Sequence, residues 1–400
     1  MRAKGEGTIQ RLGDKKYVWL GYYTDIEGKK KRKALYAKTK KEVIDKWKKW
    51  AKKIEETRLC DNGNMTVKTW GERWLSLRRN KLKIKTQQQY ETYLKTYVYP
   101  YIGTKAINKV TAMELQELLN KLSERLAPDT VAGVRNRLVT LFGTAVKFEL
   151  LHKNIAEDTL KPKVKRMEEI DVFSEDEIKK ILKQAQEDTE NEMLSDQQIL
   201  LYQSFNIFIN LMFFTGCREM EALGAKPENI DLQNGIFKIR QELVVTIGIP
   251  PYMGTLKTKN SVRNVPIPVA IIPLLQKWER EKEAYKDKWE NIYDNKLNLL
   301  IPNSVGGPML PSNVIKRFWK PLLEKCGVKY RNIHVIRHHY VSYLISKGVD
   351  IMLVSKLAGH SSVSFTMSRY GHIMQPSEQQ NKAIKVLDTL LMNDTQKVAS

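Results

Sequence analysis

The sequence predicts a multidomain protein that is mainly α-helical with small β elements. Its 400 residues are too many for one ordinary core, so two or three domains are expected. A 42% share of hydrophobic residues beside 28% charged residues is enough to bury such cores, which argues against disorder. Hydrophobic residues recur at helical spacing over most of the chain. We therefore expect a three-stranded sheet plus helix, a helical bundle and a larger mixed α/β domain.

The first predicted domain covers residues 1–60. GTIQRL, KYVWLGYY and KRKALYA resemble three short strands, and Thr39 with Glu42 forms a capping box that opens a helix. This segment holds 19 Lys/Arg against 8 Asp/Glu. If one sheet face packs on the helix, the other can enter a DNA major groove, as β-ribbon readers do. Otherwise the lysines form a solvated face. The candidate DNA-binding residues are Arg11, Trp19, Lys31, Arg32 and Lys33.

The second predicted domain, residues 65–160, is a helical bundle that follows the turn-rich DNGNMT. Trp70 and Trp74 are four residues apart, and capping boxes begin at Thr86 and Thr111. A last long helix is expected from Asp129 to Leu150. A basic cluster between the first two helices suits contact with backbone phosphates, which position a protein without specifying sequence. Its candidate DNA contacts are Arg78, Arg79, Lys83 and Lys85.

The third predicted domain, residues 172–395, follows the polar segment LKPKVKRMEEID. Ser174 and Glu177 form a capping box at its first helix. Helices dominate, and one β region interrupts them. IFKIRQELVV, residues 236–245, resembles a strand, and a hairpin with a Lys/Asn/Ser-rich turn is expected around residues 256–268.

The charge of the chain points to a polyanionic partner. Lys and Arg exceed Asp and Glu by 23, which gives a formal net charge of +23. So large a positive charge repels itself unless a polyanion binds. No run of about 18 apolar residues could span a membrane, and the N-terminus lacks the apolar core of a secretory signal. Nucleic acid is therefore favoured over a membrane, although charge alone also fits a merely soluble basic protein. The three scattered cysteines favour neither disulfides nor a zinc site.

Several families of catalytic motifs are absent from the sequence. It has no P-loop, no GxGxxG after a strand, no HExxH and no GxSxG. The third predicted domain also lacks clustered carboxylates of the kind that hold two Mg²⁺ ions, and its basic motifs stand nearly free of Asp. If the chain cuts nucleic acid, we therefore expect no metal and no other cofactor. Arg, Lys and His would then meet the charge at phosphorus, and a side chain or water would be the nucleophile.

Arginines of two motifs can hold a phosphate. FFTGCREMEAL places Arg218 after a Thr–Gly turn at a helix start, where its guanidinium offers a bidentate fork. Taken alone, Arg218 is more simply paired with Glu221 or Glu219. HVIRHHYVSYL places His334 and Arg337 on one helix face, where they can take a proton and hold an anion. Such a pair is common by chance.

The stretch LAGHSSVSFTMSRYGHI contains a second candidate group. His360 follows a glycine that can end a helix, and Tyr370 lies ten residues further on. A tyrosine becomes a nucleophile only where a base and nearby cations favour the phenolate. We expect the remaining histidines of this region, His338, His339 and His372, to be structural.

In their order along the chain these motifs resemble those of the tyrosine recombinases, and more closely the phage-type integrases of bacteriophages and conjugative transposons. The resemblance covers nearly the whole chain, and none of the six matching positions departs from the pattern. It implies that the three domains are an arm-type DNA-binding domain, a helical core-type DNA-binding domain and a catalytic tyrosine-recombinase domain. The matching residues are Arg218 in TGCRExExL, Lys257 in KTKxSxRxVPIP, His334 and Arg337 in HxxR, His360 in LAGHSS and Tyr370 in RYGH.

The resemblance also implies a role for each residue. Tyr370 would attack a DNA phosphodiester, forming a 3′-phosphotyrosine and freeing a 5′-hydroxyl. Arg218 and Arg337, helped by His360, would hold the non-bridging oxygens. His334 would be the base toward the tyrosine. Lys257, with Lys259 as the alternative in the same turn, would be the acid for the leaving oxygen.

The expected partner is double-stranded DNA at specific attachment sites, bound by a synaptic tetramer, with accessory directionality or DNA-bending proteins and no membrane. The setting is the bacterial cytoplasm, at the nucleoid. An apolar stripe on the tail, with Ile384, Leu387 and Leu391, docks either on its own domain or on a neighbouring protomer. The function implied is a site-specific integrase of a mobile element. The alternatives are a type IB topoisomerase-like nicking-closing enzyme and a DNA-binding protein without catalysis.

Overall fold

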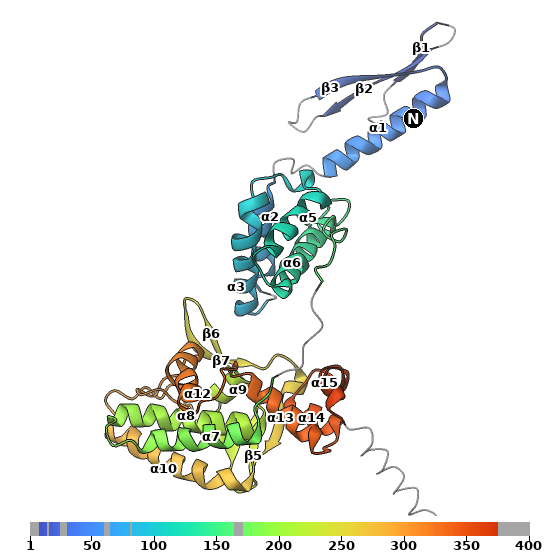
Figure 1. Ribbon diagram of the computed structural model, residues 1–400. Coiled ribbons are helices and arrows are strands. Elements are labelled where there is room, and N and C mark those ends of the chain that lie inside the picture. Colours follow the sequence, from blue (N-terminus) through green and yellow to red (C-terminus); the bar gives the residue numbers. More distant parts are fainter. Residues whose placement is uncertain are drawn as a thin grey trace, which may run out of the picture. The chain divides into compact units, whose positions relative to one another are not determined.

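The chain divides into two units, Met1–Arg166 and Met167–Ser400. A computed structural model describes residues 8–13, 16–24, 30–59, 65–80, 82–163 and 171–374 (Figure 1). Among these residues, no helix is both long enough and apolar enough to cross a membrane. The tail residues Ile384, Leu387 and Leu391 lie outside the described ranges.

The first unit begins with an antiparallel sheet in the order β1–β2–β3, followed by a long helix. The elements are β1 (Thr8–Arg11), β2 (Tyr17–Thr24), β3 (Lys30–Ala37) and α1 (Lys40–Leu59). Thr39 caps α1 by accepting a hydrogen bond from the Glu42 N–H at 3.2 Å. Trp19 of β2 is 3% exposed, and its ring lies 6.0 Å from Trp47 and 5.5 Å from Trp50. The sheet therefore packs on α1 through Trp19.

A helical bundle forms the rest of this unit. It contains α2 (Val67–Arg78), α3 (Ile84–Tyr93), α4 (Tyr99–Ile102), α5 (Ala112–Ser123) and α6 (Pro128–Lys147), with a π-helical turn over Leu94–Val98. Two buried indoles join α2 to α6, because Trp70 donates to the Leu141 carbonyl at 3.2 Å and Trp74 to the Thr144 hydroxyl at 3.1 Å.

The caps of this bundle agree only partly with the predictions. The capping box of Thr111 and Glu114 is confirmed at the start of α5. The box predicted at Thr86 is wrong, because α3 already begins at Ile84 after Lys83, and Thr86 lies in its first turn. The cap of α2 is Thr66, which accepts from the Thr69 N–H at 3.1 Å.

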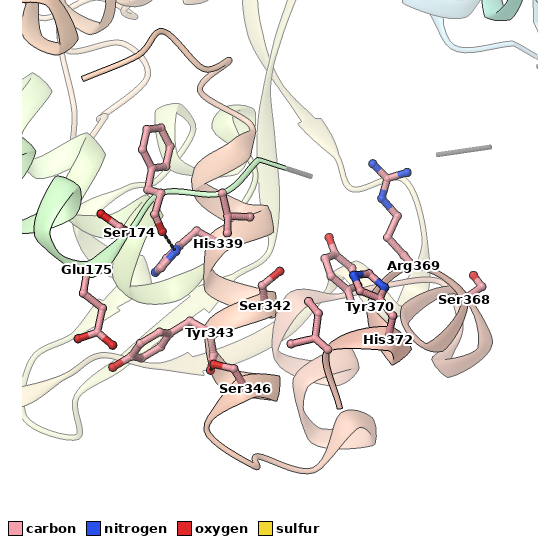
Figure 2. Close-up of a pocket in the computed structure, with 13 residues that line it drawn as sticks. Ser174, Glu175, His339, Ser342, Tyr343, Ser346, Ser368, Arg369, Tyr370 and His372 are labelled. Atoms are coloured by element: carbon pink, nitrogen blue, oxygen red, sulfur yellow. Dashed lines mark hydrogen bonds between the residues drawn. The ribbon is translucent and has the colours of Figure 1, made fainter. Parts of the chain in front are cut away.

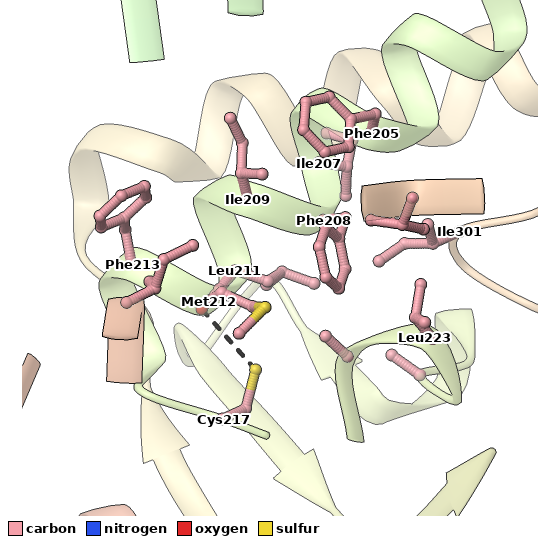
Figure 3. Close-up of a cluster of buried hydrophobic side chains, with 14 of the residues drawn as sticks. Phe205, Ile207, Phe208, Ile209, Leu211, Met212, Phe213, Cys217, Leu223 and Ile301 are labelled. Carbon is pink, nitrogen blue, oxygen red and sulfur yellow. Dashed lines mark hydrogen bonds between the residues drawn. The ribbon is translucent and has the colours of Figure 1, made fainter. Parts of the chain in front are cut away.

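The second unit is built around α8 (Asp196–Thr215), a helix that is buried for most of its length. Its other helices are α7 (Glu175–Glu187), α9 (Glu219–Leu223), α10 (Ile272–Lys288), α11 (Pro311–Asn313), α12 (Lys320–Lys325), α13 (Val335–Ser346), α14 (Ile351–Ala358) and α15 (Val363–Tyr370). Side chains from Phe205 to Phe213 pack with Leu223, Ile301 and Cys217 in the core of this unit (Figure 3). The capping box of Ser174 and Glu177 is confirmed at α7.

Two small sheets lie beside these helices. One has the order β4–β5–β8, with β4 (Ile230–Asp231), β5 (Ile236–Ile239) and β8 (Arg263–Pro266); the other pairs β6 (Gln241–Thr246) with β7 (Ile249–Thr255). The strand predicted over residues 236–245 is thus divided at Arg240. The hairpin predicted around 256–268 is wrong, because β8 pairs with β5 and the actual hairpin joins β6 to β7. Its turn contains Gly248 at φ +74°, a backbone that glycine adopts without strain.

Candidate active site

Arg337 of α13 is a buried cation without a carboxylate partner in the described part of the chain. It is 4% exposed, and its Nη1 donates to the Gly216 carbonyl at 2.8 Å. Gly216 ends α8 at φ +59°, and a Cβ there would lie 2.2 Å from the Tyr340 ring, so this position requires glycine. Burial, together with the charges of Arg218 and Arg263, lowers the pKa of Arg337 to about 9. An anion bound beside Arg337 would relieve this unfavourable charge.

Arg218 belongs to a network centred on a buried carboxylate. Glu221, which is 1% exposed, accepts from Arg218 Nη1 at 2.6 Å and from Arg263 Nη2 at 2.8 Å. Arg218 is the N-cap of α9, and its side chain is 32% exposed. Burial alone would raise the pKa of Glu221, but the hydrogen bonds and charge of Arg263 and the charge of Arg218 bring it below the ordinary value. The ion pair between Arg218 and Glu221 that the sequence suggested is therefore present. It fixes the Arg218 guanidinium while leaving part of it accessible.

The C-terminus of α14 is held by the same two arginines. Arg218 Nη2 donates to the Gly359 carbonyl at 2.8 Å, and Arg263 Nε donates to the Leu357 carbonyl at 2.7 Å. Gly359 adopts φ +68°, and a Cβ there would lie 2.9 Å from Arg263 Nη1. The glycine therefore lets the chain turn directly beneath the arginine, and this turn places His360 next to the network.

His360 is a buried, neutral imidazole. It is 8% exposed, and its Nδ1 lies 2.8 Å from the Thr366 hydroxyl. Burial, followed by the charges of Arg337 and Arg218, lowers its pKa to about 3. Its ring stacks nearly parallel to that of Tyr370, with centroids 6.2 Å apart. His360 thus stacks on the tyrosine, within reach of the charges of the arginines.

Tyr370, the last residue of α15, is 2% exposed. Its Oη lies 2.5 Å from Nδ1 of His338 on α13. Burial raises the pKa of Tyr370, an effect that the charges of Arg337 and Arg369 oppose. The hydroxyl is therefore protonated and hydrogen-bonded to an imidazole.

The partner of Tyr370 corrects one expectation. His338 was expected to serve only packing or helix capping, yet it contacts the tyrosine hydroxyl, whereas His334 has its ring edge-on to His338 with centroids 5.4 Å apart. Desolvation, together with Arg337 and Arg218, lowers the pKa of His334. His339 does conform to expectation, since its Nδ1 contacts the Phe173 carbonyl at 2.9 Å.

The structure thus brings together five of the six residues singled out in the sequence: Arg218, His334, Arg337, His360 and Tyr370. Lys257 and Lys259 are exposed in the segment between β7 and β8, and no hydrogen bond ties either to those five within the described residues. Sequence reasoning missed Arg263, Glu221 as a buried anchor and His338.

A cavity of about 670 Å³ lies beside Tyr370 (Figure 2). The end of α15 forms one wall, α13 forms another, and the start of α7 closes the third side. His372, which was expected to be structural, is exposed and lines the cavity just after the end of α15. The polar lining residues are Ser174, Glu175, His339, Ser342, Tyr343, Ser346, Ser368, Arg369 and His372.

The predicted DNA-binding residues of the sheet fall on both of its faces. Trp19 is wrongly assigned, because its indole is buried against α1. Since alternate residues of a strand face opposite sides, Arg32, paired with Tyr22, lies on the face away from Trp19. By the same alternation the other three basic candidates belong to the Trp19 side: Arg11, Lys31 and Lys33.

The predicted DNA-binding residues of the bundle surround the link between α2 and α3. Arg79, Lys83 and Lys85 are exposed. Arg78 is half-buried, and its guanidinium lies 4.7 Å from the centre of the Trp74 ring. Contact of these four residues with DNA stays a prediction.

Arginines and neutral histidines around a tyrosine hydroxyl, on a mainly helical domain, are the parts expected of a tyrosine recombinase. Residues 171–376 match the profile described as the Phage integrase family, and residues 67–162 match the Phage integrase central domain. The chain belongs to the phage integrase family. It is a tyrosine-type site-specific DNA recombinase, an enzyme that breaks and rejoins DNA strands.

Two relatives match this chain over nearly their whole length. The chain is 30% identical over 390 residues to the tyrosine recombinase XerC-like protein of Caldanaerobacter subterraneus, a match that covers 92% of this chain and 94% of the relative. It is 25% identical to the ICEBs1 integrase of Bacillus subtilis, with 92% and 95% covered.

Solved structures show the same fold. The Tn1549 transposon integrase in complex with transposon right end DNA superposes with a TM-score of 0.65 at 19% identity, covering 81% of this chain and all of that one. A lambda integrase dimer bound to a core site gives a TM-score of 0.54 at 15% identity, with 76% and 95% covered.

Proposed function

We propose that this recombinase is the integrase of a mobile genetic element, and that it inserts and excises the element through a 3′-phosphotyrosine on Tyr370. One observation carries the assignment of the nucleophile: the Tyr370 hydroxyl is hydrogen-bonded to an imidazole 2.5 Å away. The same site holds the buried cation of Arg337, which has no carboxylate partner in the part of the chain that the structure describes. A phenol becomes a nucleophile where a base and nearby cations favour its deprotonation.

The scissile phosphate would bind between Arg218 and Arg337. Arg337 is desolvated and has no carboxylate partner among the described residues, so a phosphodiester relieves an existing penalty. Arg218 is held by Glu221 and the Gly359 carbonyl but remains partly exposed, which leaves donors for a non-bridging oxygen. Both guanidiniums are fixed before DNA binds, and preorganised donors of this kind stabilise the charge that develops at phosphorus.

His360 would add a neutral donor. If Nδ1 accepts the Thr366 hydroxyl, Nε2 carries the proton and can donate it to a phosphate oxygen. With a pKa of about 3, His360 keeps this protonation state throughout the neutral range.

The leaving 5′ oxygen needs a proton. Lys257 is our proposed donor, with Lys259 as the alternative, because both are exposed on the segment that precedes Ser261 and Arg263 of the network. The covalent phosphotyrosine keeps the energy of the broken bond, so that a 5′-hydroxyl can reseal the strand without a nucleotide cofactor.

The other domains would select and arrange the DNA. We propose that residues 1–60 bind arm-type sites, that residues 65–160 bind the core site together with the catalytic domain of 172–395, and that four protomers form the synapse at the bacterial nucleoid. The apolar stripe of the tail would dock on a neighbouring protomer. Accessory bending or directionality proteins would set the direction of the reaction.

Covalent capture tests the nucleophile. The protein is incubated with sheared genomic DNA of its source bacterium in EDTA, and protein-linked fragments are sequenced to identify the cleavage site. A suicide duplex nicked beside that site should then give a denaturant-stable adduct with the wild type and none with Tyr370→Phe. An adduct that persists in Tyr370→Phe would refute the assignment.

Strand exchange tests the wider function. Two duplexes carrying the captured site should recombine, whereas a topoisomerase-like enzyme would relax a supercoiled plasmid without joining two molecules. Relaxation with no joined product would refute the integrase assignment.

A further inference from the structure

His338 is the only imidazole whose hydrogen bond to Tyr370 is seen in the described part of the chain. Its Nδ1 lies 2.5 Å from Oη, whereas His360 meets Tyr370 ring against ring. His334, which the family resemblance suggested as the base, contacts the His338 ring edge-on. The geometry therefore distinguishes the three histidines by what each can do to the hydroxyl.

His338 is fixed by its position in α13. It follows Arg337 directly, so the side chain that would hold the phosphate and the side chain on the nucleophile are neighbours on one helix. The Tyr370 ring contacts the rings of both His338 and His360, with centroids 6.0 and 6.2 Å away. A nucleophile held by two ring contacts and a hydrogen bond keeps one orientation relative to the arginines.

The imidazole is in the form that can accept a proton. Burial, followed by the proximity of His334, Arg369 and Arg337, lowers the pKa of His338 to about 4. His338 is therefore neutral near neutral pH. With its own proton on Nε2, it presents the lone pair of Nδ1 to the hydroxyl.

We propose that His338 is a catalytic residue that accepts the Tyr370 proton during strand cleavage. The proposal rests on the proposed role of Tyr370 as nucleophile. As Oη bonds to phosphorus, its proton passes to Nδ1 of His338, which becomes an imidazolium. The bond from phosphorus to O5′ breaks, and O5′ takes a proton from a separate acid. In rejoining, the 5′-hydroxyl attacks phosphorus and gives its proton to the conjugate base of that acid. The bond from phosphorus to Oη breaks, and the His338 imidazolium returns its proton to Oη.

Bound DNA makes this transfer easier. A phosphodiester between Arg218 and Arg337 adds negative charge where cations now depress the basicity of His338. The proton of Tyr370 also becomes more acidic as its oxygen bonds to phosphorus, so transfer and attack can proceed together.

Two substitutions of His338 separate proton transfer from positioning. His338→Ala removes the acceptor, whereas His338→Asn keeps an oxygen near the position of Nδ1 that accepts a hydrogen bond but does not take a proton. With the suicide duplex under single-turnover conditions, both variants should form the adduct about 100-fold more slowly, the usual range for loss of a general base. The control is His339→Asn, which removes the adjacent imidazole that bonds the Phe173 carbonyl and should cleave at close to the wild-type rate.

The leaving group provides a second measurement. A duplex with sulfur in place of O5′ at the cleaved bond needs no acid, so it should restore cleavage to a variant that lacks the acid but not to the His338 variants. DNA affinity by gel shift and thermal melting show whether each variant is folded.

The outcomes distinguish this proposal from the assignment of Tyr370. If His338→Asn cleaves within about threefold of the wild type, or if either variant cleaves faster, His338 is not the proton acceptor. Recovery of the His338 variants on the sulfur-containing duplex would also overturn the proposal. An adduct in Tyr370→Phe would instead refute the nucleophile itself.

Discussion

The buried carboxylate of Glu221 should contribute more to stability than any surface ion pair of the second unit, Met167–Ser400. Its side chain is fully buried, at 0% exposure, and accepts from Arg218 at 2.6 Å and from Arg263 at 2.8 Å. In Glu221→Gln the amide keeps one acceptor oxygen but turns an –NH₂ group toward guanidinium donors. Two arginines then lose their only close carboxylate among the described residues. Removing one partner of a buried pair costs about 3–5 kcal/mol, because it leaves charge buried without compensation.

Thermal unfolding of the full-length protein measures this cost. For a unit of this size about 3–5 kcal/mol corresponds to a fall in Tm of roughly 6–20 °C. Glu228→Gln is the matched control, since the Glu228 side chain is 64% exposed and its nitrogen–oxygen distance to Lys226 is 3.7 Å. An exposed pair is worth about 0–1 kcal/mol, so this control should melt close to the wild type. Equal melting of the two variants would refute the anchoring role of Glu221.

Substitutions at Arg32, Trp19, Gly216 and His360 test other parts of the structure. Arg32→Ala on the outer sheet face should weaken binding to arm-type DNA and reduce the slope of log K against log salt by about 0.9, whereas Trp19→Leu should lower the Tm of the first unit instead. Gly216→Ala should destabilise the catalytic unit by more than about 1 kcal/mol in denaturant titration, because φ is +59° and the added Cβ would lie 2.2 Å from Tyr340. Burial lowers the pKa of His338 to about 4 and of His360 to about 3, below the unfolded value near 6.5, so the unfolded chain binds more protons at acidic pH. Stability should therefore fall as the pH drops below about 6.5, by up to about 1.4 kcal/mol per pH unit for each histidine, and melts of His360→Gln should show a smaller slope.

Sequence reasoning located the residues that begin or end helices. Arg218 and His334 are N-caps, and His360 follows a left-handed glycine, so each occupies a position that local sequence specifies. The capping boxes at Thr111 and Ser174 were predictable for the same reason. What these side chains touch across the fold does not follow from local sequence.

Nonlocal packing explains the failures. The sequence suggested that Glu221 pairs with Arg218 on a helix surface. The five-residue helix α9 is too short for its sequence pattern to show which face is buried. The hairpin around residues 256–268 was wrong because strand pairing depends on partners far along the chain, and β8 pairs with β5. Arg263 did leave a signal: Ser261, Arg263, Val265 and Ile267 are buried at alternate positions, so the arginine occupies the inward side of a strand pattern.

Burial and the charges of the site keep its histidines neutral, and the same charges favour cleavage. Arg218, Arg263 and Arg337 surround one carboxylate, Glu221, which leaves two positive charges in a largely buried region. Burial first, and these cations second, hold the nearby imidazoles in the neutral form, the form that can accept a proton. A bound phosphodiester supplies one negative charge, and attack by the tyrosine oxygen brings the pentavalent phosphorus to two. The excess charge of the site thus matches the transition state better than the substrate, which is the condition for lowering the barrier rather than only binding DNA.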